Sequence, residues 1–254
     1  IRDSSYPFIL MEGALGERLK REFDLDISGT VAMADLIYQQ KGRMALKTLW
    51  NEYMDIAHRY QLPFLATTPT RRANKERVYM AGYNESIITD NVDFLRTIKE
   101  TANVNMYIGG LMGCKGDAYT SERALNQEEA IAFHSWQASL FKSVGVDFLY
   151  AGIMPVLSEA IGMAVAMSDT DIPYIISFTI QRNGKLIDGH TINDAIYYID
   201  NHVSNKPVCY MTNCVHPDIV YEALSHKFNQ TQMVKNRFWG IQANTSRLSY
   251  KELD

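Results

Sequence analysis

Short apolar runs alternate with longer segments of helical periodicity along most of the chain. The runs are rich in β-branched and aromatic side chains, which is typical of buried strands. The expected strands are Phe8–Met11, Phe64–Thr68, Met106–Leu111, Asp147–Ala151, Tyr174–Thr179, Val208–Thr212 and Phe238–Ala243. The periodicity predicts helices at Val31–Gln40, Arg43–Tyr60, Glu85–Thr101, Gln127–Val144, Leu157–Met167, Ile192–Val203 and Asp218–Phe228. Strands that alternate with helices indicate βα units around a parallel sheet.

Capping residues support these boundaries. Asn126 precedes the helix expected at 127–144, and Glu129 follows three residues later, where its carboxylate favours the positive end of a helix. Gly145 then ends the apolar periodicity. Thr191 and Asp194 repeat the capping pattern before a later helix.

The order of elements predicts an α/β fold, a (β/α)8 TIM barrel, in which the visible chain lacks the eighth strand and its helices. No Gly-x-Gly-x-x-Gly turn follows the first strand, so a doubly wound sheet fits less well. The chain ends at Asp254, just after the seventh strand, and we expect the barrel to be incomplete at its carboxyl end. No Pro-, Ser- or Gly-rich linker divides residues 1–254, which predicts a single domain. The chain begins with Ile1, so an earlier targeting segment stays possible.

Composition excludes several partner classes. The 254 residues are 46% hydrophobic and 21% charged, as in ordinary soluble proteins. A net charge of -4 argues against a nucleic-acid partner, and the basic residues between 71 and 77 form only a local cluster. No apolar stretch approaches the roughly 20 residues that cross a bilayer, so no membrane partner is expected. The oligomeric state has no sequence signal.

The cysteines indicate a reducing compartment. Cys114, Cys209 and Cys214 are too few for a disulfide framework, and a cytoplasmic location fits best. Cys209 lies within an expected strand and reads as a small buried hydrophobe on the face opposite Cys214. Cys114 follows the glycine-rich segment 109–113 and is a weak candidate for a reactive thiol.

Cys214 is the most distinctive candidate for chemistry. It follows a buried strand, and Pro217 marks the start of the next helix. In parallel α/β folds this carboxyl end of a strand carries the chemistry. Cys214 and His216 form a Cys-x-His pair, but zinc requires three or four donors. The residues alone leave Cys214 as a nucleophile, a metal ligand or neither.

Other strand ends provide polar groups. Glu12 and Gly13 follow the first expected strand, where Glu12 could orient a cationic group and Gly13 allows close approach of the backbone. Thr67 ends the second strand with a hydroxyl group. A simple turn or cap is the alternative for each of these residues.

These motifs, in their order, resemble the homocysteine S-methyltransferase family. Residues 8–19 are similar to the family's opening strand and turn, and 109–113 to its Gly-Ser-x-Gly-Pro loop. Residues 65–74 and 145–159 resemble the segments at the second and fourth strands. Asn213-Cys214 matches the family's Asn-Cys motif, and Gln242 to Thr245 lies where the family has Pro-Asn-Ser. The likeness runs through nearly all of the chain.

The resemblance implies a zinc-dependent S-methyltransferase that moves a methyl group to the thiolate of homocysteine or a related small thiol, in methionine biosynthesis. It implies zinc held by Cys214 and by two adjacent cysteines on strand eight, which are expected beyond Asp254. The partners implied are a small-molecule thiol and a methyl donor of the sulfonium, betaine or folate class. The implied substrate-binding residues are Glu12, Gly13, Thr67, Asn213 and Asn244.

Two departures from the family pattern affect amino-acid recognition. Glu12 stands where the family has Asp, and Gly152 stands where it has a Glu that is thought to hold the substrate ammonium. A buried ammonium without that carboxylate loses a charge-assisted hydrogen bond. A different thiol, or compensation by Glu159, would fit this change. The alternative function is a catalytically degenerate barrel that serves as a binding or regulatory subunit.

Overall fold

The computed structural model describes residues 6–248, which form two compact units. The first contains residues 6–112 and 136–149, and the second contains residues 113–135 and 150–248. The prediction of a single domain over residues 1–254 stays a prediction.

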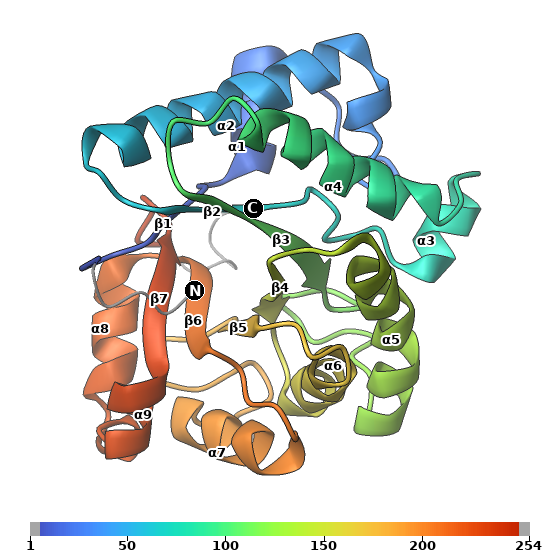
Figure 1. Cartoon of the computed structure of the whole chain (residues 1–254). Coiled ribbons are helices and arrows are strands. Elements are labelled where there is room, and N and C mark those ends of the chain that lie inside the picture. The colour runs from blue at the N-terminus through green and yellow to red at the C-terminus, as the bar shows by residue number, and fades with distance from the viewer. Residues whose placement is uncertain (1–5, 249–254) are drawn as a thin grey trace. The chain divides into compact units, whose positions relative to one another are not determined.

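The first unit contains the opening strands and the helices that follow them. Its elements are β1 (Leu10–Met11), α1 (Leu15–Phe23), the 3-10 helix η1 (Leu36–Tyr38), α2 (Gln40–Arg59), β2 (Phe64–Thr67), α3 (Lys75–Met80), α4 (Ser86–Lys99) and most of β3 (Met106–Gly113). β1 pairs in parallel with β2, and β2 pairs in parallel with β3. The helices α2 and α4 lie side by side along these strands (Figure 1).

Besides β3, whose last residue lies in the second unit, two elements belong partly to each unit, and the others follow in the second. The shared elements are α5 (Gln127–Val144) and β4 (Phe148–Met154). The second unit continues with α6 (Leu157–Ser168), β5 (Tyr174–Phe178), α7 (Ile192–His202), β6 (Cys209–Val215), α8 (Pro217–Ser225), η2 (Lys227–Asn229), α9 (Gln232–Arg237) and β7 (Phe238–Ala243). β5, β6 and β7 are parallel, and α8 and α9 flank β7 (Figure 1).

The predicted fold class is confirmed. The order of strands in the sheet follows their order in the chain, from β1 to β7, and a helix follows each strand from β1 to β6. Strands added one after another in this way, each with a crossover helix, are the pattern of a TIM barrel. The part of the chain that the structure describes has seven of the eight strands. Each predicted strand overlaps an observed one.

Glycines allow aromatic rings to pack against β3 in the first unit. A Cβ atom at Gly109 would lie 2.3 Å from Cζ of Phe148, and one at Gly110 would lie 2.6 Å from Cγ of Phe141. Real Cβ atoms do not approach carbon this closely, so these positions require glycine.

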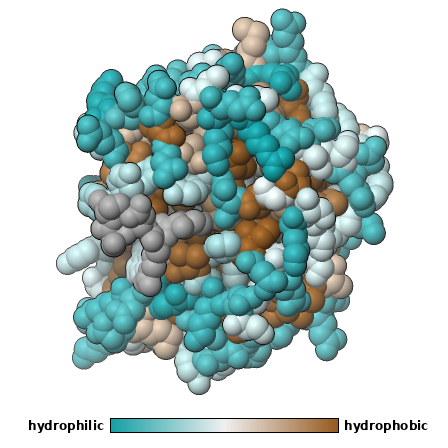
Figure 2. Space-filling view, in the orientation of Figure 1, coloured by the Kyte–Doolittle hydropathy of each residue, from teal (hydrophilic) through white to brown (hydrophobic). Residues whose placement is uncertain are grey.

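Polar side chains cover most of the face in Figure 2, and apolar atoms show between them.

A partly buried ion pair links α7 to α9 in the second unit. Asp200 accepts hydrogen bonds from Nη2 of Arg237 at 2.9 Å and from Oη of Tyr210 at 2.8 Å. The side chains of Asp200 and Arg237 are only 12% and 20% exposed, whereas Arg182 and Glu222 form a pair that is about half exposed. The first pair is therefore poorly screened by water, and the second is well screened.

The predicted helix at 31–40 is wrong. Ala32 has a φ of 53° and Gln39 is extended, so residues 31–39 contain only turns and the short η1. The left-handed backbone at Ala32 interrupts an α-helix although the residue type favours one. The prediction also missed α1, α3 and α9, which are short.

The predicted caps are confirmed. The side chain of Asn126 accepts from the backbone N–H of Glu129, and Glu129 accepts from the N–H of Asn126. Thr191 and Asp194 form the same reciprocal pair at the start of α7. Each cap satisfies backbone donors that a helix leaves unpaired at its start.

Candidate functional site

The end of β6 exposes the sulfur-bearing side chain of Cys214. A register shift between Asn213 and Val215 against β7 leaves Cys214 with a φ of 57°. Asn213 and Val215 are buried, and Cys214 between them is exposed. A β-bulge of this kind redirects a side chain, and bulges are common beside active sites. Cys209, earlier in the strand, is buried as predicted.

The amide group of Asn213 connects three strand ends. Its Oδ1 accepts from the backbone N–H of Ile153 at 3.2 Å and from Oγ of Ser177 at 2.5 Å. Its Nδ2 donates to Sγ of Cys214 at 3.7 Å. Because both donors bind Oδ1, they fix the orientation of the Asn213 amide, and its NH2 group points toward the sulfur of Cys214.

Asn244 lies beside the same cysteine. Its backbone N–H donates to the carbonyl of Val215 at 2.9 Å, and its Nδ2 donates to the carbonyl of Cys214 at 3.4 Å. The structure therefore brings together Asn213, Cys214 and Asn244, three of the residues that the sequence predicted for the site.

Ile153, at the end of β4, has a strained backbone. Its φ is 58°, which is unusual for a β-branched residue. The backbone N–H of Ile153 donates a hydrogen bond to Oδ1 of Asn213, so the side-chain amide of Asn213 holds this conformation in place. Strain of this kind occurs at functional sites when the surroundings fix it. The apolar sequence around Ile153 gave no sign of it.

His216 caps a helix. Its Nδ1 accepts from the backbone N–H of Asp218 at 3.1 Å at the start of α8, with Pro217 in the first turn. The lone pair of Nδ1 is used in this bond, so that nitrogen does not form a metal-binding pair with Cys214.

Glu12 and Thr67 meet in the first unit. Glu12 is 3% exposed, and its Oε1 accepts from the backbone N–H of Thr67 at 3.0 Å and from the Thr67 hydroxyl. Burial raises the pKa of Glu12 to about 7, although the hydrogen bonds from Thr67 oppose the shift. A Cβ atom at Gly13 would lie 2.9 Å from Oη of Tyr53, so the backbone passes close to that ring.

Glu159 does not provide a carboxylate for a substrate ammonium. It is fully buried in the first turn of α6, and its oxygens accept from two backbone N–H groups and from His134. The suggestion that Glu159 compensates for Gly152 is therefore not supported by its contacts.

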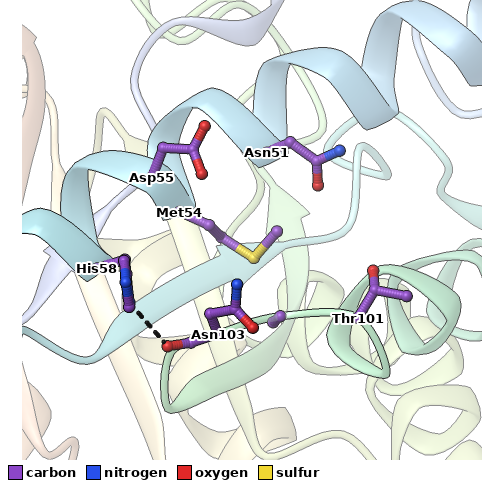
Figure 3. Close-up of a pocket in the computed structure, with 7 residues that line it drawn as sticks. Asn51, Met54, Asp55, His58, Thr101 and Asn103 are labelled. Carbon is purple, nitrogen blue, oxygen red and sulfur yellow. Dashed lines mark hydrogen bonds between the residues drawn. The ribbon is translucent and has the colours of Figure 1, made fainter.

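A polar pocket of about 270 Å³ lies in the first unit, and none of the predicted site residues lines it. Figure 3 shows Asn51, Asp55 and His58 on α2, facing Thr101 and Asn103 from the segment before β3. His58 Nδ1 lies 3.1 Å from the carbonyl oxygen of Asn103. This segment enters the amino end of β3, and in TIM barrels that end serves stability more than catalysis.

The residues present do not complete a zinc site. Within residues 6–248 no three His, Cys, Asp or Glu side chains are grouped so that they could hold a metal ion. Cys214 supplies one sulfur donor, and zinc requires at least three protein ligands.

No helix in the described part of the chain is long and apolar enough to cross a membrane.

A family model for homocysteine S-methyltransferases matches residues 9–252 of the sequence. The chain belongs to the homocysteine S-methyltransferase family. This confirms the resemblance inferred from the order of motifs along the chain, and the family assigns the chain to the S-methyltransferases. No curated protein sequence matches the chain.

Solved structures of a homocysteine methyltransferase, MmuM from Escherichia coli, share the fold. The metallated form has a TM-score of 0.72 at 17% identity, over 94% of this chain and 93% of that one. The oxidized form has a TM-score of 0.69 at 19% identity, over 85% and 77% of the two chains. The apo form has a TM-score of 0.64 at 17% identity, over 95% and 93%. At these identities the likeness establishes the fold.

Proposed function

We propose that the protein transfers a methyl group from a small-molecule donor to the thiolate of homocysteine or a related small thiol. The observation that carries this proposal is the exposed Cys214 at the end of β6, in a chain of this family. Asn213 donates to its sulfur and Asn244 donates to its backbone carbonyl. The E. coli relative of similar fold is a homocysteine methyltransferase.

The reaction needs a deprotonated thiol and an electrophilic methyl group. The thiol gives up its proton, and the thiolate sulfur attacks the methyl carbon. A sulfur–carbon bond forms while the bond from the methyl carbon to the donor heteroatom breaks, and its electron pair stays on the donor. The protein contributes by holding the two reactants in line and by excluding water.

Five residues are proposed to bind the substrate. Asn213 and Asn244 surround Cys214 in the second unit. Glu12, Gly13 and Thr67 follow β1 and end β2 in the first unit. With a pKa of about 7, Glu12 is about half ionised at neutral pH, so its attraction for an ammonium group would increase as pH rises through 7.

We also propose that the enzyme depends on zinc. Among the described residues, Cys214 is the proposed ligand. The E. coli relative of similar fold has been solved in a metallated form. The remaining ligands would have to come from outside residues 6–248, as the family resemblance implies for cysteines beyond Asp254. No step above depends on the metal. Elemental analysis of the purified full-length protein tests the proposal, with about one zinc per full-length chain expected and none expected in Cys214→Ser.

The activity is tested with homocysteine and three donors: S-adenosylmethionine, glycine betaine and 5-methyltetrahydrofolate. Mass spectrometry should detect methionine with at least one donor. Cys214→Ser should reduce kcat/KM by at least about tenfold, whereas Cys209→Ala, in the same strand but buried, should retain activity. Calorimetric binding of homocysteine without turnover would instead favour the degenerate binding subunit.

A further inference from the structure

The segment between β3 and α5 is a structured loop of residues 114–126. Oδ1 of Asp117 accepts from the backbone N–H groups of Tyr119 and Thr120 at 2.7 and 2.8 Å. A Cβ atom at Gly116 would lie 1.8 Å from the carbonyl oxygen of Glu122, so the two backbone segments touch. The loop follows the carboxyl end of β3, the end at which TIM barrels bind their substrates.

Both ends of this loop are fixed by one carboxylate. Oε1 of Glu159 accepts from the backbone N–H of Lys115 at 2.7 Å, and Oε2 accepts from that of Leu125 at 3.3 Å. Nε2 of His134, on α5, lies 3.1 Å from the same Oε1. The side chains of Glu159 and His134 are 0% and 1% exposed. The carboxylate therefore joins the loop, α5 and α6 inside the protein.

Neighbouring contacts keep the start of α6 against the loop and α5. Oγ of Ser158 donates to the carbonyl of Leu125 at 2.9 Å. A Cβ atom at Gly162 would lie 2.4 Å from Cβ of Ala130, so α5 and α6 approach more closely than a side chain would permit. Nζ of Lys115 lies 5.0 Å from the centre of the Phe133 ring, which holds the beginning of the loop against α5.

Removing this carboxylate would leave the loop without its anchors. The two backbone N–H groups are buried or half-buried and would lose their acceptor. Groups left in this state favour conformations in which they reach water. The loop would then open around Lys115 and Leu125 while the strands, which do not contact Glu159 through these bonds, stay in place.

We propose that Glu159 is a positioning residue that holds loop 114–126 in the conformation required for substrate binding. It acts through the loop and does not touch the substrate, because its oxygens are buried and engaged by protein donors. The role in catalysis rests on the proposed function, whereas the anchoring of the loop does not.

Limited proteolysis with trypsin tests the anchoring. Trypsin cleaves after Lys115 and Arg123, which lie inside the loop. In Glu159→Ala, cleavage at these two positions should be at least about tenfold faster than in the wild type, because proteolysis follows the population of the open form. Ser168→Ala is the matched control, since it removes a buried polar group near the other end of the same helix. Loop cleavage in this control should stay at the wild-type rate.

Kinetics with homocysteine test the role in binding. Glu159→Ala should raise the KM for homocysteine by about tenfold with a smaller change in kcat, because the loop must be ordered before substrate binds. If the wild type shows no turnover, the proposed function is wrong, but the anchoring can still be tested. Calorimetry then compares the homocysteine affinity of the wild type with that of Glu159→Ala. Unchanged loop cleavage, or unchanged homocysteine affinity, in Glu159→Ala overturns the inference.

Glu159→Gln provides a second variant of nearly the same shape. Its oxygen can still accept from Lys115 and His134, but its NH2 group would face the N–H of Leu125. Cleavage should therefore increase at Arg123 and remain close to wild type at Lys115. If Glu159→Gln is cleaved at Lys115 and at Arg123 at the same rates as the wild type, the proposed anchoring is contradicted. This holds even if Glu159→Ala fails to fold.

Discussion

Replacing Glu12 by Gln should make the protein more stable at alkaline pH. Burial raises the pKa of this carboxyl from 4.5 to about 7, so the folded protein holds a proton that the unfolded chain releases between these values. The contribution of Glu12 to the stability of the folded state is therefore fully present below pH 4.5 and is lost as pH rises through 7. Glutamine has no proton to release, and its oxygen can still accept from Thr67.

The magnitude follows from the shift. Each pKa unit corresponds to about 1.4 kcal/mol, so the full effect of Glu12 on the free energy of unfolding is about 3 kcal/mol. Most of this effect falls between pH 5 and pH 8. Other titrating groups change the wild type and the variant alike, and they cancel in the difference between the two proteins.

Urea denaturation of both proteins at pH 5 and pH 8 measures this difference. The stability of Glu12→Gln relative to wild type should increase by about 2 to 3 kcal/mol from the lower to the higher pH. Glu100→Gln, at an exposed glutamate, should show little change over the same range. A relative stability that is independent of pH, or that increases toward acid, would refute the reasoning about Glu12.

Three other variants test packing and the site. Gly109→Ala should cost about 2 kcal/mol or more in the free energy of unfolding because its Cβ would clash with a buried ring, whereas Gly29→Ala, in open space, should be nearly neutral in thermal unfolding. Asp200→Asn should cost about 3 kcal/mol by urea denaturation because it leaves a largely buried guanidinium without its charge partner, whereas Glu222→Gln should stay within about 0.5 kcal/mol. Asn213→Ala should cost about 2 kcal/mol, and in a methionine-forming assay it should reduce kcat/KM by at least about tenfold.

The strands and most long helices could be predicted because their signals are local. Continuous apolar runs such as the one at β5 are buried on both faces, and the caps at Asn126 and Thr191 mark the starts of helices directly. The absence of an α-helix at 31–39 could not be predicted, because the positive φ of Ala32 has no signature in the residue type. The short helices α1, α3 and α9 give too few turns of apolar periodicity.

The sequence suggests residues for the site but not their geometry. Cys214 was identified from its place after a strand, yet its exposure depends on a bulge that is defined by pairing with β7. The burial of Glu12 and the use of Glu159 by the loop depend on contacts between residues far apart in the sequence. Such contacts have no local pattern, so a glutamate near a strand end reads the same whether it faces solvent or the interior.

The most direct test of the central claim is methionine formation from homocysteine. Purified protein is incubated with homocysteine and each of the three methyl donors, with the donor methyl group carrying a stable isotope, and methionine is measured by mass spectrometry. Labelled methionine is expected with at least one donor, and at least about tenfold less of it with Cys214→Ser. Absence of labelled methionine with every donor, or full activity in Cys214→Ser, would contradict it.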